Sequence, residues 1–213
     1  EDVAVTSTAT ELNLLDGKAA TNLALLGKTE GTNFTGSLLV GHATTGTLSS
    51  ADNNTGIGIG ALDALTSGNN NTAIGKNAGT AFTSAARNTA IGTNALTTSS
   101  TNGDNTAVGR QSLKSCTGDG NTALGKDAGE GITSGVNNIA IGRNSADNLS
   151  TGSGNVIIGA DIDAAANNSA RTLKIAGNDG STTTTWISGD SAGTVSANGG
   201  HLTTTGKALV MGF

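Results

Sequence analysis

The sequence predicts an all-β protein, a parallel β-roll or β-solenoid of about seven 17-residue coils, from a repeated phrase and from its composition. The phrase, most often Asn-Thr-Ala-Ile-Gly, occurs seven times between residues 54 and 159, and its asparagines are 17, 17, 17, 16, 17 and 17 residues apart. A short fixed step with one apolar phrase per step is typical of solenoids. The chain has no proline and few aromatic residues (three Phe, one Trp and no Tyr), which suits a thin rod that is hydrogen-bonded along most of its length. Its coils should stack about 4.8 Å apart.

The phrase supplies one short strand per coil, and strand alternation assigns its side chains to two faces. The fourth position is always branched and apolar, and we expect it to form the core of the roll: Ile57, Ile74, Ile91, Val108, Leu124, Ile141 and Ile158. The second position, Thr in five phrases, shares that face and also accepts Ile139 and Val156. The third position carries small apolar residues, which would be unusual on a face that meets water. We therefore predict that another copy of the roll covers this face, with an oligomer interface at Ala73, Ala90, Ala107, Ala123 and Ala140.

The second half of each coil supplies one large apolar residue by one of two routes. The first route places leucine eight residues after the asparagine, at Leu62, Leu96 and Leu113. Where that position is small, an apolar residue follows three positions later, at Phe82, Ile132 and Leu149. This compensation favours a packed roll over low-complexity disorder. The asparagines should lie at a turn, where Asn tolerates left-handed dihedral angles, and stacked Asn side chains can bond one another along the column.

The sequence divides into an N-terminal part at residues 1–50, a repeat domain at 51–163 and a C-terminal part at 164–213. In the N-terminal part, a capping box at Thr8 and Glu11 predicts a short helix. A second short apolar stretch at 23–26 and strands at 34–50 follow it. These short elements would cap the roll or join it to another segment.

In the C-terminal part, residues 173–175 and 183–187 flank a turn sequence, Gly177-Asn-Asp-Gly180, and predict a β-hairpin. We expect Trp186 to plug the base of this hairpin, and an exposed receptor contact is the alternative. The apolar stretch at 208–213 should be buried by a neighbouring chain.

Composition and motifs point away from catalysis. The net charge of −5 comes with no basic cluster, so we expect no nucleic-acid binding, and no apolar run reaches the length of a membrane span. His42 and His201 stand in no catalytic motif, the single Cys116 cannot form an internal disulfide, and no metal or nucleotide motif occurs. Asp161 and Asp163 offer a carboxylate pair, but the chain lacks the aromatic platforms on which glycosidases bind sugars. We predict neither enzyme activity nor a cofactor.

One outward column, which is basic, and the Thr column on the face shared with Ile are candidate binding surfaces. Basic residues follow the phrase glycine in four coils: Lys76, Arg110, Lys126 and Arg143. The last three occupy consecutive coils and form a candidate anion stripe for an acidic polysaccharide, although like charges one strand apart are unfavourable unless they are solvated or countered. The Thr column suggests an ice-binding face, because regular Thr arrays on flat solenoids order water, but this array is one Thr wide.

The phrase and its step resemble the head repeats of trimeric autotransporter adhesins, and more closely the collar-like repeats of bacteriophage tail-fibre proteins, over residues 54–159. Two further pieces resemble phage fibres: Thr8-Ala-Thr-Glu-Leu-Asn-Leu-Leu-Asp-Gly17 and Leu173-Lys-Ile-Ala-Gly with Thr-Thr-Trp-Ile-Ser188. The resemblance implies a homotrimer of parallel chains, each a left-handed roll, with the alanine columns near the threefold axis.

On this basis we expect a structural fibre protein of a virion, outside the cell, that supports host attachment without catalysis. One alternative is the subunit of a homopolymeric extracellular filament, joined by exchange of terminal strands. Another is a surface adhesin that binds host cell-surface glycan through the hairpin around Trp186. Its partners would be further copies of itself and, for the adhesin, the glycan.

Overall fold

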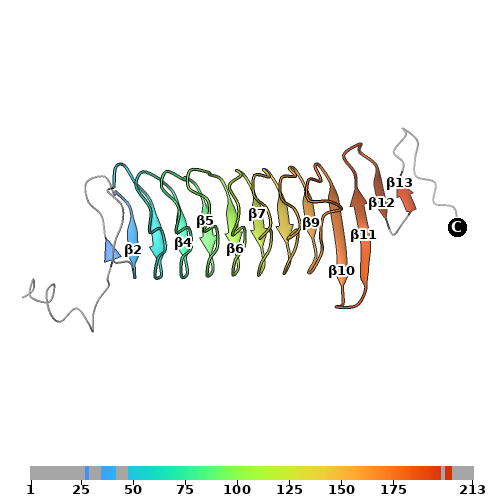
Figure 1. Cartoon of the computed structure of the whole chain (residues 1–213), viewed down its shortest axis with the longest axis horizontal. Coiled ribbons are helices and arrows are strands. Elements are labelled where there is room, and N and C mark those ends of the chain that lie inside the picture. Colours follow the sequence, from blue (N-terminus) through green and yellow to red (C-terminus); the bar gives the residue numbers. More distant parts are fainter. Residues whose placement is uncertain (1–26, 29–34, 42–47, 198–199, 203–213) are drawn as a thin grey trace, which may run out of the picture.

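The computed structural model describes residues 27–28, 35–41, 48–197 and 200–202, and all regular structure in them is β (Figure 1). The strands follow one another across a single sheet in chain order. They are β1 (Gly27–Lys28), β2 (Leu38–Val40), β3 (Thr55–Ile57), β4 (Thr72–Ile74), β5 (Thr89–Ile91), β6 (Thr106–Val108), β7 (Thr122–Leu124), β8 (Ile139–Ile141), β9 (Val156–Ile158), β10 (Leu173–Asn178), β11 (Thr183–Gly189), β12 (Val195–Ala197) and β13 (Gly200–Leu202). The described residues contain no helix long and apolar enough to cross a membrane.

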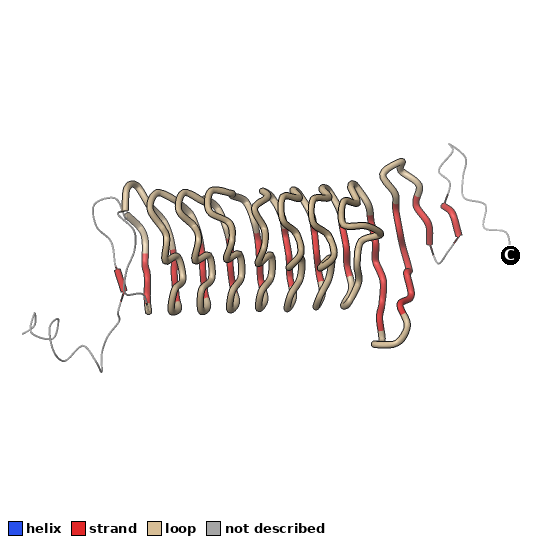
Figure 2. The backbone as a smooth tube through the Cα atoms, viewed as in Figure 1, coloured by secondary structure: helices blue, strands red, loops and turns tan. Residues whose placement is uncertain are grey.

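The predicted parallel β-solenoid is confirmed. Strands β2 to β10 pair in parallel with their sequence neighbours, and equivalent positions lie opposite each other, as Ala73 does to Ala90. The rod is longer than the seven phrases indicate, because β2 precedes the first phrase by one 17-residue step and β10 follows the last by another. The chain therefore makes about eight turns, which Figures 1 and 2 show as one row of stacked coils.

The glycine that ends each phrase is required by the stacking of the coils. Gly75 has a φ of 129°, and a Cβ added there would lie 2.7 Å from the carbonyl carbon of Gly92 in the next coil. The same column continues through the other phrases with φ between 127° and 138°. Since side-chain-bearing residues rarely adopt this conformation and the next backbone leaves no room for one, glycine fixes the turn after every strand.

The predicted orientation of the two strand faces is wrong. The third-position residues Ala73, Ala90, Ala107, Ala123 and Ala140 are 0–1% exposed within the single chain, so they point into the roll and cannot form an oligomer interface. The expected core residues Ile57, Ile74, Ile91, Val108, Leu124, Ile141 and Ile158 lie on the outer face, half-buried or exposed.

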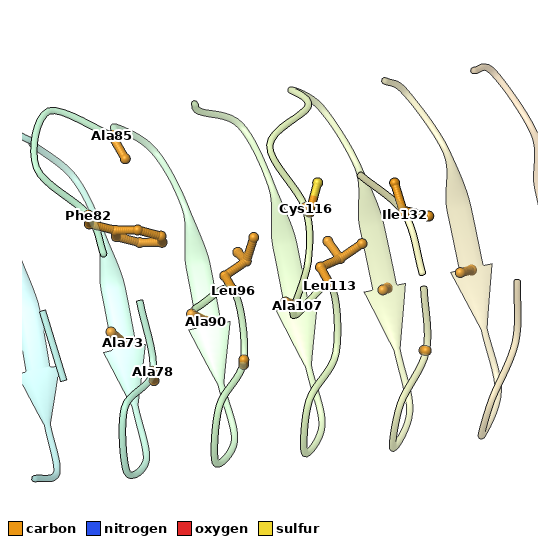
Figure 3. Packing of buried hydrophobic residues seen from close by; sticks show 14 of the residues in the cluster. Ala73, Ala78, Phe82, Ala85, Ala90, Leu96, Ala107, Leu113, Cys116 and Ile132 are labelled. Carbon is orange, nitrogen blue, oxygen red and sulfur yellow. The ribbon is translucent and has the colours of Figure 1, made fainter. Parts of the chain in front are cut away.

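The thickness of the roll explains the inversion. Large side chains from the opposite wall reach the inner face of the strands, so little space remains there. At Gly56, an added Cβ would lie 3.2 Å from a methyl carbon of Leu62 on the opposite wall and would also overlap Leu39 of the adjacent strand. Figure 3 shows Leu96, Leu113 and Ile132 filling this space between the two walls. A methyl group on the strand is enough to complete such a core.

The two routes to a large core residue are confirmed. All six predicted residues are completely buried: Leu62, Leu96, Leu113, Phe82, Ile132 and Leu149. The second route needs a small residue at the first position, because a Cβ added at Gly79 would lie 2.8 Å from the ring of Phe82. In two coils of the first route the later position holds a small buried residue, Ser99 or Cys116. The coil that begins at Asn54 departs from this pattern, because it buries both Leu62 and Leu65 and carries Gly56 in place of the strand alanine.

Both ends of the parallel array continue into antiparallel strands. At the N-terminal end β1 pairs with β2. At the other end β10, β11, β12 and β13 form a meander, which confirms the predicted hairpin. Trp186 does not plug its base, since 55% of its surface is exposed. The predicted N-terminal helices and the apolar stretch at 208–213 lie outside the described residues, and the domain boundaries remain predictions.

Candidate functional site: the outer face of the sheet

A buried ladder of asparagines keeps the coils in register. The backbone N–H of each asparagine donates to the side-chain oxygen of the asparagine one coil earlier, at 2.9–3.0 Å. Each side-chain N–H donates to a backbone carbonyl 13 or 14 residues ahead, at 2.6–3.0 Å. The ladder comprises Asn54, Asn71, Asn88, Asn105, Asn121, Asn138 and Asn155, all 0–1% exposed. The predicted bonding along the column is confirmed, but the left-handed conformation belongs to the residue before each asparagine, as at Asn70 with a φ of 59°.

Hydroxyl groups close this ladder at both ends. Asn54 N–H donates to Ser37 Oγ at 2.7 Å, and Thr172 Oγ1 donates to Asn155 Oδ1 at 2.7 Å. Every buried polar group of the column thereby finds a partner, which a buried amide requires. Because the ladder fixes the register of each strand relative to the next, the outward side chains of the sheet also form regular columns.

The outer strip is the surface formed by the outward residues of β2 to β10. It has two columns in register, one continuing the second phrase position and the other the fourth. The first column is Leu38, Thr55, Thr72, Thr89, Thr106, Thr122, Ile139, Val156 and Leu173, and the second is Val40, Ile57, Ile74, Ile91, Val108, Leu124, Ile141, Ile158 and Ile175. None of these residues is charged.

The strip is large for an uncovered apolar surface. Nine strands about 4.8 Å apart span about 38 Å, and three residues of each strand span about 10 Å. Leu124 is 50% exposed, Ile57 40% and Ile139 37%. A patch of about 400 Å² is near the largest found on ordinary monomers, and such patches commonly mark interaction sites. The sequence shows the fourth-position column, but because we assigned that column to the core, we did not predict it as part of an exposed surface.

The predicted anion stripe is matched by carboxylates. Arg110 pairs with Asp127 at 3.2 Å between Nη2 and Oδ2, Lys126 contacts the same carboxylate, and Arg143 pairs with Asp161. The three cations do lie in consecutive coils as expected, but their charges are largely countered. These partly exposed pairs add little stability and leave a weak site for an acidic polysaccharide.

The candidate carboxylate pair is also rearranged. Asp161 accepts a hydrogen bond from Asn144 at 2.8 Å in addition to its ion pair with Arg143. The perturbed group is instead Asp147, whose pKa is raised to about 6 by partial desolvation of its exposed side chain and by the neighbouring carboxyl of Asp163. The sequence held the signal for it, because Asp147 stands 17 residues after Glu130, so the fold stacks like charges. Within the described ranges, no three His, Cys, Asp or Glu side chains are placed to hold a metal ion.

Cys116 is part of the core and not a reactive site. Burial raises the pKa of its thiol to about 11, so the nucleophilic thiolate is scarce at neutral pH. This position takes the place of a large core residue in a first-route coil, which accounts for a small, apolar-like side chain there.

Comparisons with protein-family models, with curated proteins and with solved structures found no match to this chain.

Proposed function

We propose that the chain is the subunit of a structural fibre, a rod that assembles with parallel copies of itself into a homotrimer through the outer strip. The fibre would belong to a virion or a comparable extracellular appendage and would support attachment to a host. The observation that carries this proposal is the uncharged, half-exposed outer strip running along the parallel array.

A second copy of the chain is the occupant that suits the strip best. Two parallel copies present the same column at the same pitch, so their side chains can interdigitate along the whole rod. The strip has a footprint of about 400 Å² and includes five threonines, so at about 25 cal/mol per Å² its burial contributes at most roughly 10 kcal/mol per copy. Association costs about 4–15 kcal/mol, so contact along most of the strip is needed. The number of three copies rests on the resemblance to phage fibres and autotransporter heads.

Sedimentation equilibrium on the full chain tests the proposal. A homotrimer of the 20.6 kDa chain has three times that mass. Introducing charge on the strip, as Ile74→Asp with Ile91→Asp, should dissociate it into monomers, because several apolar contacts become buried charges. Ser134→Asp, at an exposed position on the opposite wall, is the control and should keep the assembled mass. A wild-type chain that stays monomeric at high concentration would refute the proposal.

Ice binding is the second candidate function, and one feature of the outer strip favours it. Thr55, Thr72, Thr89, Thr106 and Thr122 lie on the outer face, in register on consecutive strands. A monomer would leave this array open to water, whereas an assembly would cover it. Thermal hysteresis of the wild-type solution, together with its loss in Thr89→Lys, would favour ice binding. We expect no hysteresis.

The open filament receives less support from the ends of the rod. Antiparallel strands of the same chain pair with the first and last parallel strands, β1 on β2 and β11 on β10, so an incoming strand could not extend the parallel array directly and would have to pair with β1 or β13. Electron micrographs of discrete rods would agree with a fibre subunit, and fibrils of unlimited length would favour the filament.

A further inference from the structure

The hairpin beyond the last coil displays the most exposed aromatic side chain among the described residues. Ile175 on β10 pairs with Ile187 on β11, but Ala176 pairs with Thr185, so Trp186 has no partner across the strands. This is a β-bulge, a feature that redirects a side chain. An indole that is 55% exposed is costly for solubility, so its position calls for an explanation.

Trp186 is supported on one side by a glycine. A Cβ added at Gly177 would lie 2.7 Å from Cζ2 and 2.9 Å from Cη2 of the indole. The six-membered ring therefore rests directly on the backbone of β10, where any larger residue would displace it. This support holds the ring in place while much of its surface remains accessible.

Polar groups surround the ring. A hollow of about 470 Å³ is lined by Gly177, Asn178, Asp179, Thr182, Thr184 and Trp186. Asp179 Oδ1 accepts hydrogen bonds from the backbone N–H groups of Ser181 and Thr182 at 2.9 and 2.8 Å. These hydrogen bonds lower the pKa of Asp179. Among the described residues, the hydroxyls of Thr182 and Thr184 act in no hydrogen bond.

We propose that this hollow binds one neutral sugar residue of a glycan, stacked on Trp186. The electron-rich face of an indole attracts the polarised C–H groups on the flat side of a pyranose, and the threonine hydroxyls and the Asp179 carboxylate can bond the sugar hydroxyls. The hollow is shallow and open to solvent on one side, which suits one sugar residue of a longer chain more than an enclosed small ligand. Its one charged lining residue is a carboxylate, and no Lys or Arg lines it, so sialic and uronic acids would be repelled.

The inference deepens the proposed function, since it names the chemistry by which such a fibre would contact a host surface. The two remain separable, because binding at the hairpin does not require the outer strip and assembly through the strip does not require Trp186. Burial of Trp186 against another copy is the competing use of this surface.

Fluorescence offers a direct test, because Trp186 is the single Trp of a chain without Tyr. The emission of the full chain should be quenched by acrylamide, which shows an accessible ring, and should shift saturably with neutral oligosaccharides of glucose, galactose or N-acetylglucosamine. Oligogalacturonate and sialyl oligosaccharides should give no shift. An emission that acrylamide cannot quench would overturn the proposal in favour of a self-contact.

Calorimetric titration with the oligosaccharide that gives the largest shift compares the variants. Trp186→Ala should weaken binding by about tenfold or more, the loss expected when a stacked ring is removed. Gly177→Ala should weaken it severalfold by displacing the ring, while circular dichroism stays unchanged. Ile59→Ala, which removes an apolar side chain that is 72% exposed near the other end of the rod, should bind like the wild type. Absence of binding to every neutral oligosaccharide, or equal binding by Trp186→Ala, would overturn the proposal; the assembled mass, measured separately, reports on the proposed function.

Discussion

Moving the large core residue of one coil from the first route to the second tests the packing of the roll. The coil that begins at Asn88 uses Leu96, which is fully buried with a φ of 49°, and holds the small Ser99 three positions later. The coil that begins at Asn121 uses Gly129 and Ile132 at the same two positions. The double variant Leu96→Gly with Ser99→Ile therefore copies an arrangement that the chain already contains.

The single changes should each be costly. Leu96→Gly removes a buried side chain, which costs about 2–5 kcal/mol of unfolding free energy. It recovers about 1–2 kcal/mol, because glycine adopts the left-handed conformation without the strain that leucine has there. Ser99→Ile alone puts two large residues into a layer whose strand carries Ala90, whereas the layer that holds both Leu62 and Leu65 has Gly56 there. Overpacking costs about 1–3 kcal/mol. If the two effects were independent, the double variant would lose about 1–7 kcal/mol.

The unfolding free energy of the double variant should instead lie within about 1 kcal/mol of the wild-type value, because one large side chain replaces the other. Loss of the Ser99 hydroxyl, which is buried without a hydrogen-bond partner, is common to the Ser99→Ile single variant and the double variant, so it does not enter the coupling between the two sites. Guanidinium unfolding followed by circular dichroism measures the coupling, and hydrogen exchange of the amides in this coil locates it. The control pair, Leu96→Gly with Ser134→Ile, should show no rescue. Additive losses in the first pair would refute the compensation.

Three further predictions concern single sites. Gly75→Ala should cost more than about 3 kcal/mol in unfolding free energy, because the methyl group would contact Gly92 and the φ is unfavourable; Gly193→Ala, with nothing within 4 Å, should cost about 1 kcal/mol, and similar losses would contradict the stacking. The raised pKa of Asp147 means that the folded chain holds a proton that the unfolded chain has released, so stability should fall as the pH rises from about 4 to 6. Asp147→Asn should flatten that profile of denaturation midpoints, and an unchanged profile would contradict the assignment. The Cys116 thiol should react with a disulfide reagent at neutral pH only as fast as the chain opens, because it is buried with its pKa raised to about 11; rapid reaction of the native chain would contradict its place in the core.

The sequence predicted the features of this fold that depend on spacing. The step of the asparagines determines the coil and its register, and the alternation between Leu96 in one coil and Phe82 in another predicted a filled interior. The amide of Asn has both a donor and an acceptor, so a column of buried asparagines implied the ladder. The turn at Gly177 to Gly180 predicted the hairpin because its residues favour a tight reversal.

The orientation of the strand depends on what lies opposite, which spacing alone does not give. Both faces of the phrase are apolar, so alternation separated Ala90 from Ile91 without indicating which one faces inward. The volume of the second half of the coil held the missing information. Since Leu96 already fills the interior, the strand needs only a methyl group there, and the bulkier Ile91 must point out. The exposure of Trp186 follows from a β-bulge in the hairpin, and no pattern in the sequence predicts this bulge.

Thiol cross-linking at adjacent positions of one strand tests the central claim most directly. In a Cys116→Ser background, Thr89→Cys places a thiol on the outer strip and Ala90→Cys places one inside the roll. Parallel copies that meet through the strip should give covalent dimers under mild oxidation for Thr89→Cys, while Ala90→Cys stays unreactive in the folded chain. Cross-linking through Ala90→Cys, or a Thr89→Cys thiol that reacts freely while the chain remains monomeric, would contradict the claim.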